Sequence, residues 1–133
     1  MKKIIKSEKA QALVEFTLIM PIIIVLILGM IEFGWLLNAK ITLNSAAREG
    51  ARVGAVLLTT DANRKTKVIN AAQGTIDQSG ITLLFDECTV TYEDDDIENI
   101  HNIVVVLKGD VKPIIGLYVT GNVKMTATVR MRR

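Results

Sequence analysis

Two carboxylates, Glu15 and Glu32, interrupt an otherwise apolar stretch that runs on to Leu37. A carboxylate placed centrally in a bilayer costs about 2.5–3.5 kcal/mol, and less near the interface. Glu15 therefore either marks the cytoplasmic boundary of a membrane helix, where it reaches water, or carries a function. Glu32 stands beside Trp35, an aromatic-belt residue at the outer interface, and we interpret it as an ordinary interfacial residue.

The rest of the chain offers little catalytic chemistry. One cysteine, Cys88, and one histidine, His101, argue against a disulfide framework, a zinc-type site and a Ser/His/Asp or Cys/His arrangement. The acidic run at residues 93–98 lacks the glycine turn and distal glutamate of an EF-hand and is interpreted as a solvated loop. A net charge of +2 is too small to favour nucleic acid as a partner. We expect a non-enzymatic protein without cofactor or metal.

The apolar stretch predicts a single membrane anchor. Residues 16–31 carry no charge, and about 20 residues cross the hydrocarbon core of a bilayer. The stretch is too long for a cleavable secretory signal and lacks its small-x-small site. Lysines precede it at Lys2, Lys3, Lys6 and Lys9, which predicts a cytoplasmic N-terminus. We expect a basic leader (residues 1–10), a transmembrane part (11–37) and an extracytoplasmic domain (38–133) in the cell (inner) membrane.

Hydrophobic periodicity predicts an α+β fold. Helical spacing continues past the membrane and indicates one helix over residues 11–58, kinked near Pro21. A second helix is expected over residues 61–78, capped by Thr59, Thr60 and Asp61 and closed by Gly80. The period then changes to two, which predicts strands near residues 81–85, 88–92, 103–107 and 123–131, with a short helical turn or loop at 113–121. The expected architecture is a long N-terminal transmembrane-plus-extracytoplasmic helix packed on a small antiparallel sheet.

Small residues recur four apart in the second half of the long helix. Such rows let another backbone approach closely, and the packing gain should offset the cost of about 1 kcal/mol for each helical glycine. The covering surface is either the chain's own sheet or a neighbouring subunit, and the sequence favours neither. The two rows are Ala46, Gly50, Gly54 and Ala47, Ala51, Ala55.

Three segments in the same order resemble the TadE-like pilins of the tight-adherence (Flp) pilus system. They are residues 10–21, with an LVEF-type start to the span, residues 29–34, with an IEFG-type segment, and residues 46–52, AAREGAR. The resemblance covers about residues 9–55. It implies a minor pilin or pseudopilin with a type IV pilin-like fold that takes part in pilus assembly or initiation and in cell adhesion.

The resemblance also implies processing by a membrane-embedded prepilin peptidase. Type IV pilin precursors are cut so that a glutamate stands fifth in the mature chain, which places the cut between Ala10 and Gln11 if that glutamate is Glu15. Ala10 stands where the family usually has glycine. The new amine could pair with Glu15 of a neighbouring subunit and so set the axial register. The implied partners are the prepilin peptidase, other pilins, the inner-membrane assembly platform and membrane lipid. The alternative is an uncleaved, single-pass, membrane-anchored extracytoplasmic sensor or binding module.

Overall fold

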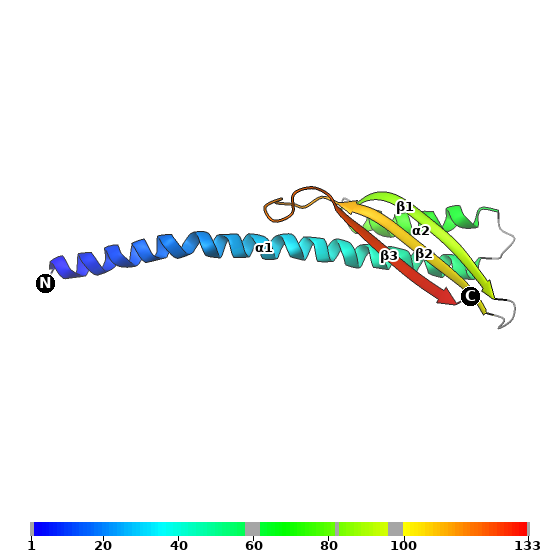
Figure 1. Ribbon diagram of the computed structural model, residues 1–133, viewed down its shortest axis with the longest axis horizontal. Helices are drawn as coiled ribbons and strands as arrows, with labels where there is room; N and C mark the ends of the chain where they lie inside the picture. Colours follow the sequence, from blue (N-terminus) through cyan, green and yellow to red (C-terminus); the bar gives the residue numbers. More distant parts are fainter. Residues whose placement is uncertain (1, 58–61, 82, 96–99, 133) are drawn as a thin grey trace.

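The computed structural model describes residues 2–57, 62–81, 83–95 and 100–132. A long helix, a shorter helix and a three-stranded antiparallel sheet follow one another along the chain, which confirms the predicted α+β class. Their bounds are α1 (Lys2–Val56), α2 (Arg64–Gln78), β1 (Leu83–Asp95), β2 (Ile100–Val111) and β3 (Val123–Arg132). Figure 1 shows α1 as a rod running almost the whole length of the molecule, with the other elements gathered over its C-terminal half.

Helix α1 begins nine residues before the predicted start at residue 11, because no helix-breaking residue separates the basic leader from the span. It also continues through Pro21, and Figure 1 shows a gently curved rod without a break there. Proline has no N–H to donate to the carbonyl one turn earlier, at Thr17. The Thr17 hydroxyl donates to the Leu13 carbonyl at 2.7 Å, a side-chain bond that often accompanies helix bending.

Helix α2 ends as the sequence predicts. The Ser79 N–H donates to the Ile76 carbonyl, and Gly80 follows with φ of +68°. This left-handed backbone conformation, which glycine adopts without a Cβ penalty, is the common way to terminate a helix. The N-cap candidates Thr59, Thr60 and Asp61 lie outside the described residues.

The sheet has the order β1-β2-β3, with the apolar strand β2 in the centre as predicted. The two expected strands at 81–85 and 88–92 form one strand, β1, whose register shifts between Phe85 and Glu87. This bulge explains the imperfect alternation in the sequence, because an extra residue moves the inward positions from odd to even numbers. Leu83 is buried before the bulge and Val90 after it. Residues 93–95 of the acidic run belong to β1 and not to the loop that we expected, and Glu93 pairs with Arg130 of β3. Residues 96–98 of the run lie outside the described residues.

The core lies between the inner face of the sheet and the two helices. Figure 1 shows the sheet crossing obliquely over the C-terminal half of α1, with α2 running alongside that half. Apolar side chains from α1, α2 and the strands fill the space between them and exclude water, which provides the main driving force for folding. The fully buried members include Ala39, Leu43, Val68, Ala72, Ile103, Val105 and Leu107. The predicted loop at residues 113–121 is confirmed as irregular structure between β2 and β3.

Cys88 faces the core from β1 and is half-buried. Burial raises the pKa of its thiol, since the charged thiolate is poorly solvated there. We therefore expect iodoacetamide to alkylate the folded protein more slowly than an unhindered cysteine at pH 8, with the rate still rising above pH 9. Alkylation in denaturant is the control and should recover the ordinary thiol profile. Equal rates in the folded and denatured protein would contradict the buried placement.

Candidate functional site

The N-terminal half of α1 stands clear of the globular domain. Every residue from 8 to 27 is exposed, and the most apolar 18-residue window has a mean hydropathy of 2.6. The helix is therefore long and apolar enough to cross a membrane, which makes it a candidate span. Apolar side chains that nothing in the chain covers are expected to face lipid or another protein.

The residues of the expected cleavage site lie on this bare part of α1. Ala10, Gln11 and Glu15 are all exposed, and the Ala10–Gln11 peptide bond is inside the helix. Because residues four apart share a helix face, Gln11 and Glu15 are neighbours, about 5–6 Å apart at Cβ. The Cα–Cβ bonds of a helix tilt toward its N-terminus, so the side chain of Glu15 starts out on the Gln11 side of its own Cα. Among the described residues, Glu15 has neither an ion-pair nor a hydrogen-bond partner.

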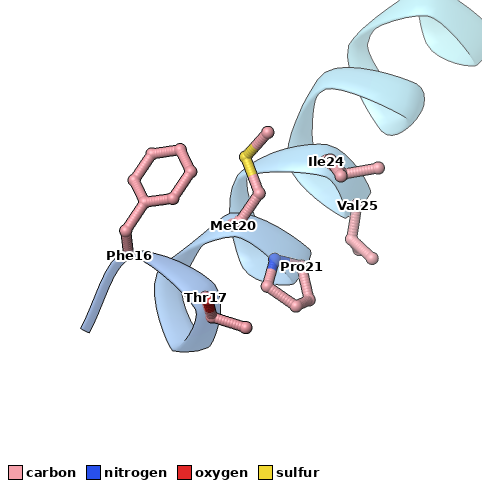
Figure 2. A pocket seen from close by; sticks show the side chains of 6 residues that line it. All are labelled: Phe16, Thr17, Met20, Pro21, Ile24 and Val25. Carbon is pink, nitrogen blue, oxygen red and sulfur yellow. The ribbon is translucent and has the colours of Figure 1, made fainter. Parts of the chain in front are cut away.

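A shallow apolar groove follows the same part of α1 around Pro21. Figure 2 shows the side chains that line it, which come in three successive pairs one helical turn apart along the exposed helix. The groove therefore belongs to the exposed surface that lipid or a second helix would cover. The lining residues are Phe16, Thr17, Met20, Pro21, Ile24 and Val25.

Glu32 is not the ordinary interfacial residue that we expected. It is fully buried, and its carboxylate accepts two backbone hydrogen bonds from the segment joining β2 to β3. Oε1 accepts from the Gly116 N–H at 2.8 Å and Oε2 from the Tyr118 N–H at 3.3 Å. Bonds from two amides offset part of the cost of removing this carboxylate from water. We call residues 112–122, which Glu32 holds, the β2–β3 loop.

Further contacts fix the β2–β3 loop against α1. The Tyr118 hydroxyl donates to the Val25 carbonyl at 2.5 Å, and the Trp35 indole N–H donates to the Lys112 carbonyl at 3.2 Å. Gly29 leaves room for the tyrosine, since a Cβ there would lie 3.1 Å from the Tyr118 ring. Figure 1 shows the loop extending past the end of the sheet, over α1 and toward its N-terminal half.

The sequence contains one signal that points to a special role for Glu32. An ionisable residue inside an apolar span is a functional candidate by default, and Glu32 meets that description as well as Glu15 does. Nothing in the sequence, however, connects Glu32 to amides 84 and 86 residues away. The loop partner becomes visible only in three dimensions.

The rows of small residues pack within this chain. All are buried except Ala55, which is half-buried. A Cβ on Gly50 would lie 3.3 Å from Val68 Cγ1, and one on Gly54 would lie 2.1 Å from Ile103 Cδ1. The close approach of α1 to α2 and β2 thus depends on the two glycines. The covering surface in this structure is the chain's own α2 and sheet.

A buried arginine lies at the same contact. Arg64 of α2 donates a hydrogen bond from its guanidinium to the Gly54 carbonyl at 3.2 Å, and the guanidinium lies 3.6 Å from the centre of the Tyr92 ring. A cation over an aromatic face is stabilised by the ring quadrupole, and more so when water is excluded. Arg64 thereby links α1, α2 and β1 at the end of the domain farthest from the bare helix.

Comparison with known proteins finds one family model that matches part of the chain. Residues 10–52, all within α1, match the family model described as TadE-like protein. The match confirms the resemblance drawn from the residues and includes Glu15, Glu32 and most of the small residues. No curated protein and no solved structure matches the chain.

Proposed function

We propose that this TadE-like chain is a non-enzymatic minor pilin or pseudopilin that takes part in assembling or initiating a tight-adherence pilus. The family match over residues 10–52 supports an association with pilus machinery. In this proposal a prepilin peptidase removes residues 1–10. The mature chain then remains in the cell membrane, with its C-terminal domain on the extracytoplasmic side. Other pilins and the inner-membrane assembly platform are its further partners.

The observation that carries the proposal is an exposed carboxylate on a bare apolar helix. Glu15 needs a positive partner if the surface around it is to be covered by lipid or protein, because an unpaired charge there is costly. Cleavage before Gln11 creates such a partner, an α-amine one helical turn from Glu15 on the same face. In a single processed chain the two groups can neutralise one another.

In a fibre the same two groups can set the register between subunits. A neighbouring helix satisfies both charges only at one axial height, so pairing across subunits selects that height. The domain and its β2–β3 loop already contact α1 from Val25 onward, whereas residues 8–24 are exposed and make no hydrogen bond or ion pair with another described element. Subunit contacts through α1 are therefore assigned to the N-terminal half of the helix.

The alternative function is that of an uncleaved, membrane-anchored sensor or binding module. Two observations favour it: Ala10 replaces the usual glycine, and the Ala10–Gln11 bond is held in a continuous helix. A peptidase must unwind this helix locally to reach the bond. Unwinding is inexpensive here, because residues 8–13 are all exposed and pack against no other element.

The mass of the membrane-extracted protein separates the two functions. In cells with a working prepilin peptidase we expect an intact mass corresponding to residues 11–133, with Gln11 as the first residue. Matched cells lacking the peptidase should yield the uncleaved chain. A chain that still begins at Met1 when the peptidase is active and cleaves another pilin in the same cells would overturn the proposal and favour the anchored module.

A further inference from the structure

We propose that the β2–β3 loop is a second membrane contact, which inserts Ile114, Leu117 and Tyr118 into the extracytoplasmic leaflet beside α1. The globular domain would then rest on the bilayer at two places instead of swinging freely at the end of its helix. This inference requires that α1 spans a membrane, but it holds whether or not the leader is cleaved.

The first argument is the exposure of the loop's apolar side chains. Ile114, Leu117 and Tyr118 are 57%, 53% and 44% exposed, and they lie within five residues of one short loop. Apolar side chains clustered on a projecting loop, and not scattered singly, indicate a surface that something else covers. The exposed apolar surface continues onto α1 at Phe33, whose ring centre lies 6.3 Å from that of Tyr118, so the loop and the helix form one patch.

The second argument is the depth at which the loop meets α1. About 20 residues counted from Gln11 place the outer edge of the hydrocarbon layer near Met30. The loop contacts α1 on both sides of that level: Tyr118 reaches Val25, while Gly116 reaches Glu32. Val25 lies about 8 Å inside the edge at helical rise, which is the depth that interfacial apolar segments reach. Lipid is therefore the surface next to this patch.

The third argument is that α1 satisfies two backbone N–H groups of the loop and the hydroxyl of Tyr118. Irregular backbone is tolerated at membrane depth only where protein satisfies its N–H and carbonyl groups. Glu32 accepts the N–H groups of Gly116 and Tyr118, and the Val25 carbonyl accepts the tyrosine hydroxyl. This explains why a buried carboxylate, Glu32, lies at the outer edge of the span: it accepts hydrogen bonds from two loop N–H groups that would otherwise face lipid without a partner.

The charges at the base of the loop fit the same placement. Lys112 is the first residue of the loop and Lys124 follows its end in β3, and both are exposed; Asp110 of β2 lies opposite Lys124 in the sheet. At the base of a loop whose tip enters the acyl region, these ammonium groups would lie among the headgroup phosphates, which attract them. Apolar residues at the tip and cations at the base are the pattern expected of a segment that enters the interface.

The test uses the full chain in vesicles of phosphatidylcholine and phosphatidylglycerol. With Cys88→Ala as background, a nitroxide label is placed at Leu117→Cys, at Ile27→Cys on the exposed face of α1, and at Thr91→Cys on the outer face of the sheet. Oxygen concentrates in lipid and a nickel chelate in water. We expect the label at position 117 to collide with oxygen as the label at 27 does, and the label at 91 to prefer the nickel chelate.

Two other outcomes would overturn the inference. A label at 117 that collides with the nickel chelate as often as the label at 91 does would place the loop in water. A label protected from both reagents would mean that protein, such as a second copy of the chain, covers the patch.

A pair of glycine variants tests the role of the packing against α1. Gly29→Val puts side-chain atoms where the Tyr118 ring lies, whereas Gly34→Val on the same helix meets nothing within 4 Å of its Cβ. We expect Gly29→Val to shift the label at 117 from oxygen toward the nickel chelate, and Gly34→Val to leave it unchanged. Equal behaviour of the two variants would show that the contact with α1 does not hold the loop in lipid.

The label at position 91 reports whether Gly29→Val disturbs the folding of the domain. If it does, a third variant keeps the test informative. Tyr118→Phe removes only the hydroxyl that bonds the Val25 carbonyl. It should produce a smaller shift in the same direction. An unchanged label at 117 in both Tyr118→Phe and a correctly folded Gly29→Val would count against the proposed seating.

Discussion

Glu15→Ala is expected to be processed normally but to enter pili at less than a hundredth of the wild-type level. Removing one partner of a buried ion pair leaves the other charge unpaired and costs about 3–5 kcal/mol, and each 1.4 kcal/mol is a factor of ten in an equilibrium. In this variant the unpaired charge is the amine of Gln11. The measurement is the amount of the chain in sheared pilus fractions relative to the membrane fraction.

The chain offers matched controls for this prediction. Glu8 is an exposed carboxylate and the third residue before the proposed cut, so Glu8→Ala should leave assembly unchanged once the leader has been removed. Glu15→Asp keeps the charge but shortens the side chain, and it should assemble at an intermediate level. If Glu15→Ala were assembled as well as the Glu8→Ala control, the pairing of carboxylate and amine would be the wrong explanation for the position of Glu15.

Gly54→Ala is expected to lower the free energy of unfolding of the domain by about 1–3 kcal/mol, the usual cost of overpacking a core. The added Cβ would lie 2.1 Å from Ile103 Cδ1 and 2.9 Å from Val68 Cγ2, and both neighbours are fully buried. They therefore have little room to move aside. Loss of the sheet signal in circular dichroism, followed with denaturant on the full chain in detergent, measures the change.

The matched variant is Gly74→Ala, in the middle of α2. A Cβ there would meet nothing within 4 Å, so the substitution adds helix propensity without a clash. It should raise the free energy of unfolding by about 0.5–1 kcal/mol. The two Gly→Ala substitutions would then change the free energy of unfolding in opposite directions, and the difference would come from their packing environments. A Gly54→Ala protein as stable as Gly74→Ala would mean that α1 does not approach β2 as closely as described.

The two parts of α1 serve different purposes. Where the globular domain covers the helix, the glycines serve its close contact with α2 and β2, and substitutions there are expected to act through folding. Toward the N-terminus, residues 8–27 are exposed, and substitutions there are expected to act through membrane or subunit contacts. Stability and assembly measurements on the same variants therefore report on different parts of one helix.

Local pattern in the sequence determined the elements of this protein. An uncharged apolar run longer than the apolar core of a signal peptide specifies a helix that can span a membrane, and a period of two specifies strands with one buried face. The continuous apolar run of β2 identified the central strand, because both its edges are covered by neighbours. The resemblance over α1 was also local, since its three segments follow one another within a single helix.

Tertiary structure alone decided which distant groups meet. The bulge in β1 could not be recognised from the sequence. Inward-facing residues have odd numbers before the bulge and even numbers after it, so the alternation looks interrupted until the register with β2 is known. The sequence left open what covers Gly50 and Gly54, and the fold brings α2 and β2 onto them. Glu32 looked like a boundary residue until the β2–β3 loop was seen to donate its amides to it. The physical reason is that periodicity records which side of an element is buried, whereas the partner on that side depends on the path of the whole chain.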